Sequence, residues 1–543
     1  MITAQKIPAH AVLDEMHLGD IRGALGTITS GDTKARKGVW ARVVTFLAIL
    51  GPGLIVMVGD NDAGAFGTYT QAGQNYGTAL LWTLVLLIPV LYVNQEMVLR
   101  LGVVTRVGHA RLILERFGKF WGMFSVLDLF VLNGLTIVTE FIGISLAANY
   151  FGLPKILGVA IAAVLVMIAV STGNFRRFER FAVFLCIGSL LLIPVLIAVH
   201  APLGQTAHDL IIPNMPKGDL SVIMLLIIGI VGTTVAPWQL FFQQSYVIDK
   251  RITTRFMNYE RWDLVVGIIF VMIGGIAMIS LSSATFTAHK EFGNFADAGQ
   301  VAFGIAKYVG HIPATLFIIA LVDACIIGAA AVGLSTAYAV GDLLSYKHSL
   351  HRGVTDAPQF YTVYVGLIAI AAAIVLIPGS PLGLLTNAVQ VFAGVLLPSA
   401  TVFLLLLSND KAVLGPWANT RRVNAFTSLV IVMLVMLSII LVASVLFPSF
   451  GTTQTLWTLG SGAMFAVLLA AWTAFSPSRA HETLGPTSEP KANWQMPPLH
   501  TLPRLALTPL TNLWLVILRI YLITAIGLVV VRVVQLALHH GSL

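Results

Sequence analysis

The sequence predicts an all-α integral membrane protein with about 11–13 transmembrane helices, two of which are interrupted along their length. The chain of 543 residues is 57% hydrophobic and 10% charged, and its mean hydropathy is +0.88. A soluble protein of this size could not bury so much apolar surface, so the bilayer must be its solvent. Glycine and proline interrupt two of the apolar runs at similar depth.

Each predicted span is a run with few or no charges that is long enough to cross roughly 30 Å of hydrocarbon. The runs are too apolar on every face to be amphipathic helices of a soluble core. In order they cover residues 43–76, 77–99, 121–149, 156–173, 179–199, 221–242, 263–285, 311–344, 361–378, 382–408, 424–447, 455–475 and 512–535.

The two interruptions divide the chain into related parts. Residues 59–65 (GDNDAGA) break the first span, residues 229–237 (GIVGTTVAP) break the sixth, and four uninterrupted spans lie between them. Such a pair of breaks predicts two inverted five-helix repeats around a site at mid-membrane depth. The predicted parts are an N-terminal tail (1–42), helices 1–5 (43–199), helices 6–10 (221–408), additional helices (424–475), a flexible polar connector (476–510) and a C-terminal apolar helix (511–535).

The basic residues orient the protein and explain its net charge of +8. If the N-terminus is cytoplasmic, every predicted cytoplasmic loop is rich in arginine or lysine, whereas the opposite loops carry only Lys155, Lys217, Lys290 and Lys307. This asymmetry predicts a multi-pass protein of the plasma (inner) membrane with its N-terminus inside, and it requires no nucleic acid as a partner. Two isolated cysteines exclude a disulfide framework and a CxxC metal site.

Two carboxylates, Asp60 and Asp62, fall inside the first break. An ionised side chain at that depth costs several kcal/mol unless it is paired, and no lysine or arginine lies near in sequence. A cation from solution, held by the carboxylates and by backbone carbonyls of the unwound segment, is the natural partner. The alternative is that an aspartate only caps the half-helix that begins at the break.

The residues from Gly51 to Trp82, GPGLIVMVGDNDAGAFGTYTQAGQNYGTALLW, resemble the first helix of the Nramp divalent-metal transporters. The resemblance extends to Gln95 and Glu96, to Arg100–Thr105 and to Phe175–Glu179. It covers roughly residues 40–408 and is strongest to the Nramp-related magnesium transporters. It implies a LeuT-like (APC-type) inverted-repeat fold that works by alternating access around helices 1 and 6.

The resemblance also implies a metal site and shows where this chain departs from it. The family's Asp-Pro-Gly-Asn break becomes Asp62 to Ala65 here, and its Met-Pro-His break becomes Ala236, Pro237 and Trp238. The implied metal-site residues are Asp62, Gly59, Thr233, Ala236, Gln390 and Asp60, and those that shape the site are Asn61, Gly64, Ala65, Pro237, Trp238 and Glu140.

These departures predict a different ion. Loss of the thioether removes a soft ligand that favours transition metals. Loss of two ligand side chains widens the pocket, which suits magnesium because that ion keeps several of its waters. Of the residues that the family uses to move protons, only Glu140 remains, since the others correspond to Ile137, Trp238 and Gln243. We therefore expect a carrier of Mg²⁺, and also of Mn²⁺, that is not obligatorily proton-coupled.

Two transporter alternatives stay open: a proton-coupled Mn²⁺ or Fe²⁺ importer of the same family, and a sodium-coupled symporter of an organic solute. A membrane-embedded enzyme or receptor is a third class, but the sequence contains no nucleophile constellation, no HExxH pattern and no Walker A motif. We expect a monomer that is not an enzyme, carries no cofactor, and has the divalent cation and the lipid bilayer as its partners.

Overall fold

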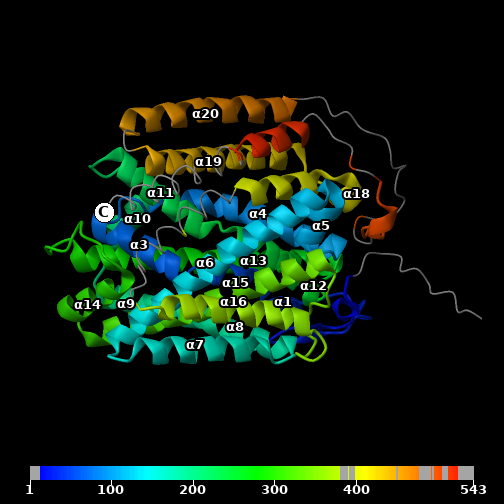
Figure 1. The fold of residues 1–543 in the computed structure, drawn as a ribbon, viewed down its shortest axis with the longest axis horizontal. Coiled ribbons are helices and arrows are strands. Elements are labelled where there is room, and N and C mark those ends of the chain that lie inside the picture. The colour runs from blue at the N-terminus through cyan, green and yellow to red at the C-terminus, as the bar shows by residue number, and fades with distance from the viewer. Residues whose placement is uncertain are drawn as a thin grey trace, which may run out of the picture.

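The computed structural model describes residues 13–378, 398–447, 450–475, 494–503 and 511–521, together with the single residues 389, 491, 505 and 523. Long helices lie side by side along one common direction (Figure 1). The N-terminal segment lies at one end of this bundle, and α14 (Ala298–Tyr308) lies at the other. We call the end that carries the N-terminal segment the basic end, because the arginine-rich connections gather there.

The first predicted span folds as three helices: α1 (Val39–Ile49), α2 (Pro52–Val58) and α3 (Ala63–Tyr76). The predicted interruption separates α2 from α3. A second interruption, which we did not predict, bends α1 against α2 by 54° at the Gly51-Pro52-Gly53 sequence. Gly51 has a φ of 155°, which favours glycine, and Pro52 occupies the first position of α2, where its missing N–H costs nothing.

The sixth predicted span is also two helices, α11 (Leu220–Thr234) and α12 (Pro237–Asp249). Val235 ends α11, Ala236 precedes α12 in an extended conformation, and Pro237 is the first residue of α12. Proline cannot donate the hydrogen bond that would continue α11, so the break forms where the sequence places it.

The other helices are continuous or joined by short turns. They are α4 (Trp82–Thr105), α5 (His109–Phe117), α6 (Lys119–Tyr150), α7 (Lys155–Val170), α8 (Phe175–Gly188), α9 (Leu192–Ala198), α10 (Leu203–Ile211), α13 (Met257–Phe286), α15 (His311–Leu344), α16 (Pro358–Leu376), α18 (Lys411–Leu414), α19 (Arg421–Leu446) and α20 (Thr452–Phe475). Short 3₁₀ turns occur at η1 (Glu15–His17), η2 (Ser189–Leu191), η3 (Thr254–Phe256), η4 (Gly415–Trp417) and η5 (Leu499–Thr501).

Among the described residues, nine helices are long and apolar enough to cross a membrane, or ten if the bent pair α1–α2 counts as one span. The sequence predicts about 11–13. The difference arises because α7 has only 16 residues and because the predicted spans 382–408 and 512–535 are described only in part.

The core of the bundle forms where the broken helices meet the longest continuous ones. Helix α15 packs along α6, α12 and α16, and α13 packs along α2 and α3. At the edge of the bundle, α20 packs mainly on α19 and buries only 17% of its most apolar window (Figure 1). Its exposed side chains are largely apolar, as expected of a helix that faces lipid.

Candidate ion site at the two helix breaks

Asp62 stands at the point where the first break ends and α3 begins. Its Oδ1 accepts a hydrogen bond of 2.9 Å from the Ala65 amide, so the side chain caps the helix, and the residue is 7% exposed. Capping uses one of the lone-pair positions of a carboxylate and leaves others for a ligand. The two interpretations of Asp62, as a cap and as an ion ligand, are therefore compatible.

Glu140 of α6 lies against the same helix start. Its Oε2 accepts a hydrogen bond of 3.1 Å from the Ala63 amide, and the side chain is fully buried. Gly328 of α15 permits this arrangement: a Cβ atom there would lie 3.0 Å from Cδ of Glu140 and 3.2 Å from Cβ of Asp62. The structure thus brings together two acids that are far apart in the sequence.

Asp60 lies inside the break and is 1% exposed. Neither of its carboxylate oxygens accepts a hydrogen bond from the residues that the structure describes. The side chain of Gln239 lies beside it; its amide oxygen accepts a hydrogen bond of 2.9 Å from Gln95, and its NH2 group donates to the Thr234 carbonyl at 3.4 Å. A carboxylate in this position is strongly destabilised as an anion unless a cation or a proton joins it.

The second break lies next to the first. The Tyr69 hydroxyl of α3 is 2.7 Å from the Thr234 hydroxyl of α11, which ties the two interrupted helices together. Thr233 is 7% exposed, and Ala236 is half-buried at the start of α12. The contact between Tyr69 and Thr234 therefore holds the two interrupted helices against each other close to their breaks, as expected of paired breaks in an inverted-repeat fold.

Trp238 fills space beside the first break. It is 1% exposed, and a Cβ atom on Gly59 would lie 3.3 Å from its indole ring. The Trp238 carbonyl accepts a hydrogen bond of 2.9 Å from Ser335, whereas its indole N–H has no partner within the described ranges. The indole thus occupies volume beside Gly59 that a smaller side chain would leave open.

Of the remaining predicted residues, some lie beside the breaks and others do not. Ala65, Gly64 and Pro237 are buried next to the breaks. Asn61 instead faces α13: its amide donates to the Val271 carbonyl at 3.4 Å, and Gly274 leaves the space for it. Gln390 lies outside the described residues. Within those residues no group of three or more His, Cys, Asp or Glu side chains is arranged to hold a metal ion.

Sequence reasoning missed Gln239, Tyr69 and Gly328 as parts of this region. Gln239 could have been found, because a glutamine in an apolar span must be paired inside the protein. Tyr69 and Gly328 carry no such indication in the sequence, since their contacts depend on how α3, α11 and α15 pack.

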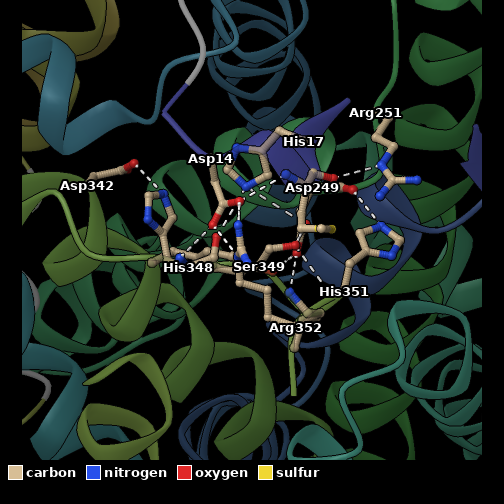
Figure 2. Close-up of polar contacts among 12 residues, drawn as sticks. Asp14, His17, Asp249, Arg251, Asp342, His348, Ser349, His351 and Arg352 are labelled. Atoms are coloured by element: carbon tan, nitrogen blue, oxygen red, sulfur yellow. Dashed lines mark hydrogen bonds and ion pairs between the residues drawn. The ribbon is translucent and has the colours of Figure 1, made fainter. Parts of the chain in front are cut away.

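A second polar cluster lies at the basic end of the bundle. It joins side chains of the N-terminal segment to side chains of the helix ends and connections beside it (Figure 2). Arg352 pairs with Asp14 at 2.7 Å, and Arg251 donates to the Met16 carbonyl at 2.8 Å. His17 lies 3.8 Å from Asp249 of α12, and His348 pairs with Asp342 of α15 at 3.0 Å.

Beyond His17, the N-terminal segment forms two short strands, β1 (Ile21–Arg22) and β2 (Thr27–Ile28), which pair in an antiparallel arrangement. The contacts of Asp14, Met16 and His17 join the segment to the end of α12 and to the connection between α15 and α16.

The electrostatics of this cluster favour docking. Burial alone would raise the pKa of Asp14, but hydrogen bonds from Arg352 and from the Met16 amide outweigh it and lower the pKa to about 2. Burial lowers the pKa of His17 despite the nearby Asp249. For His348, the Asp342 partner outweighs burial, so its pKa is raised. The docking of the segment therefore depends on an ionised Asp14, which Arg352 holds by charge-assisted hydrogen bonds.

Comparison with known proteins identifies a family and individual relatives with similar sequences. The model of the family described as natural resistance-associated macrophage protein-like (Nramp) matches residues 53–444. A protein of Ralstonia nicotianae named divalent metal cation transporter MntH is 27% identical over 407 residues, which is 71% of this chain and 88% of that protein. A protein of Burkholderia ambifaria with the same name is 26% identical over 418 residues, or 73% and 89% of the two chains.

Solved structures support the same fold. The manganese transporter of Eremococcus coleocola matches with a TM-score of 0.64 and 22% identity over 84% of this chain and 98% of that one. A Na⁺-coupled sialic acid symporter matches with a TM-score of 0.51 and 14% identity over 78% and 90%. The predicted all-α transporter fold with two broken helices is thereby confirmed.

Proposed function

Because this chain belongs to the Nramp family, we propose that it is a secondary carrier that moves divalent metal ions across a membrane. The observation that carries the proposal is the pair of buried aspartates at the first break, for which no ion pair exists among the described residues. A divalent cation bound there would compensate their charge, and unwound carbonyls would supply further oxygen ligands.

We propose magnesium, bound with part of its hydration shell, as the main substrate, with manganese also carried. The support is chemical: the second break has Ala236, Pro237 and Trp238, and so it offers neither a thioether nor an imidazole. Oxygen ligands and retained waters suit a hard ion that dehydrates reluctantly. In this proposal Asp62 binds the ion, directly or through water. Asp60 does not contact the ion but adds negative charge around the group of ligands.

A proton-coupled carrier of Mn²⁺ or Fe²⁺ is the second candidate. It is favoured by the relatives, which are named as divalent metal cation transporters or as a manganese transporter, and by Glu140 beside Asp62. In our preferred scheme, transport is not obligatorily coupled to protons and is driven inward by the membrane potential, which is worth about 2.3 kcal/mol per charge per 100 mV.

We further propose that the basic end faces the cytoplasm and that the carrier lies in the plasma membrane. The support is the concentration of arginine and lysine in the connections at that end. Two inverted repeats, residues 43–199 and 221–408, would then rock around the breaks to expose the site to each side in turn.

The deciding experiment measures uptake of Mg²⁺, Mn²⁺ and Ca²⁺ into proteoliposomes with a simultaneous pH readout of the lumen. We expect Mg²⁺ uptake without matching acidification, and we expect Asp62→Ala to abolish it while the exposed Asp356→Ala control retains it. Ala236→Met should shift the preference toward Mn²⁺ by restoring a soft ligand. Uptake of Mn²⁺ alone, with acidification in proportion, would establish the second candidate instead.

A further inference from the structure

A fully buried acid cluster lies where α2 docks on α13, at the end of α2 opposite to the Asp60–Asp62 break. The docking is close because glycines face each other: a Cβ atom on Gly267 would lie 2.4 Å from the Gly53 carbonyl oxygen. Asp263 of α13 accepts hydrogen bonds from the Gly53 amide at 2.7 Å and from the Leu54 amide at 3.2 Å. Its charge is therefore stabilised by the free amides at the start of α2.

Lys250, at the end of α12, is the positive group of this cluster. Its ammonium donates to the carbonyls of Ile49 at 2.5 Å and Leu50 at 2.9 Å, and it pairs with Glu179 of α8 at 2.7 Å. Both charged side chains are completely buried. Backbone carbonyls therefore use two of the three ammonium hydrogens, and Glu179 is the only carboxylate of the described residues that forms an ion pair with Lys250.

Glu260 is the member of the cluster that remains without compensation. It lies one turn before Asp263 on α13 and is fully buried, and neither of its carboxylate oxygens has a hydrogen-bond partner in the described ranges. The titratable groups that act on it are Asp263 on its own helix, Lys250 from α12 and Glu179 from α8. Three carboxylates thus share one ammonium in a region without solvent.

We propose that Glu260 is a proton-binding site that locks α2 against α13 on the cytoplasmic side. An ionised Glu260 would be an unpaired buried charge next to Asp263, at a cost of several kcal/mol, whereas the protonated acid is neutral. When α2 leaves α13, water reaches the carboxyl group, its O–H bond breaks, and the proton passes to water on the cytoplasmic side. The closed arrangement therefore binds one more proton than the open one.

The consequence is a gate that responds to cytoplasmic pH. This inference rests on the alternating-access carrier proposed above, in which α2 must move for the ion to leave toward the cytoplasm. With a difference of one proton, the ratio of open to closed molecules rises about tenfold for each unit of pH over the range in which the closed arrangement keeps the proton and the open arrangement has released it, and above that range it stays constant. Acid in the cytoplasm would hold the gate closed, whichever metal ion is carried.

The test is hydrogen–deuterium exchange of residues 52–58 in the full-length protein in lipid nanodiscs at pH 6, 7 and 8, with rates corrected for the intrinsic effect of pH. For the wild type we expect opening to increase by about tenfold per pH unit over part of this range. Glu260→Gln imitates the protonated acid and should abolish the slope. Glu260→Met, which is neutral and of similar volume, should do the same and serves if the glutamine variant fails to fold.

Glu96→Gln is the matched control. Glu96 is an acid at the same end of the bundle, but it pairs with Arg261 at 2.6 Å and with Arg100 at 3.2 Å and is partly exposed. Its removal should leave the wild-type slope unchanged. A flat wild-type profile, or an unchanged slope in the Glu260 variants, would overturn the proposal. Because exchange is measured without transport, either result is independent of whether Asp62→Ala abolishes uptake.

Discussion

At the scale of single residues, this protein places carboxylates where water cannot reach them and uses glycines to bring helices close to them. Asp60 and Glu260 are buried without hydrogen-bond partners among the described residues, whereas Asp263 is held by backbone amides. Gly328 leaves space for Glu140 beside Asp62. Each uncompensated acid is expensive in isolation, so each is expected to bind a cation or a proton during the transport cycle.

Gly328→Ala tests whether the missing side chain at position 328 is what allows Glu140 to lie beside Asp62. The added Cβ atom would stand 3.0 Å from the Glu140 carboxyl carbon and 3.2 Å from Cβ of Asp62, so the two acids must shift by a few tenths of an ångström. We expect a cost of about 1–3 kcal/mol and an ion affinity lower by about tenfold for each 1.4 kcal/mol lost at the site. Isothermal titration with Mg²⁺ and Mn²⁺ measures this loss. Gly366→Ala in α16, where a Cβ atom meets nothing within 4 Å, should bind as the wild type does.

At the scale of elements, helix α2 and the N-terminal segment are held by apolar and polar contacts with the bundle rather than by their own length. Helix α2 has seven residues, too few to be stable alone, and its start is capped by Asp263. The segment that begins at Asp14 is joined to the bundle by Arg352 and Arg251 (Figure 2). Helix α2 also buries Leu54, Ile55, Val56, Met57 and Val58 in the apolar core, so its detachment must expose this surface as well as break the cap.

Arg352→Ala should release the N-terminal segment locally. The hydrogen bonds of Arg352 to Asp14 are charge-assisted and worth about 1.5–3 kcal/mol. Since the pKa of Asp14 is lowered to about 2 from 3.8, the pair contributes stability above about pH 4 that is lost as the pH falls toward 2. Hydrogen–deuterium exchange of residues 13–28 should therefore be faster in the variant at pH 6–7, and the difference should shrink below pH 4.

The exposed Arg177→Ala substitution on α8 is the control for this experiment, because its side chain lies in solvent. It should leave exchange of the N-terminal segment unchanged. Equal exchange in wild type and Arg352→Ala at pH 7 would show that the pair does not hold the segment in place.

At the scale of the whole molecule, the two broken helices link a site in the middle of the bundle to the contacts at its basic end. Helix α2 runs from the first break to the acid cluster, and α12 runs from the second break to Lys250 and Asp249. Movement of either half-helix must therefore change both regions. This linkage suits a carrier that opens one side only when the other is closed.

Gly267→Ala should shift the conformational equilibrium of the bundle. The new methyl group would lie 2.4 Å from the Gly53 carbonyl oxygen, which belongs to the backbone and cannot rotate away. We expect docking of α2 to weaken by about 1–3 kcal/mol, with faster exchange in residues 52–58. Gly366→Ala gains the same helix propensity without a collision, so slower or unchanged exchange in both variants would contradict the docking geometry.

Much of this architecture was predictable from the sequence, and the reasons are local. Composition determines that the chain spans a membrane, and Pro237 and the Gly-Asp-Asn-Asp run both favour a helix end, although a proline alone does not enforce one, since Pro89 lies inside the unbroken α4. Asp62 could be placed at a helix start for the same reason. The sequence did not reveal the second bend at Gly51, because a Gly-Pro-Gly run is compatible with a helix start or with a loop.

The partners of each acid depended on the tertiary structure alone. Glu140 meets Asp62 and Asn61 turns to α13 because of how α2, α6, α13 and α15 pack, and the same packing leaves the Glu260 carboxylate without a hydrogen-bond partner among the residues that the structure describes. Hydropathy and backbone breaks are properties of a segment and its solvent, so the amino-acid order by itself determines them. The group that compensates a buried charge belongs to a segment that can be hundreds of residues away in the sequence. Only the folded bundle therefore decides which group that is.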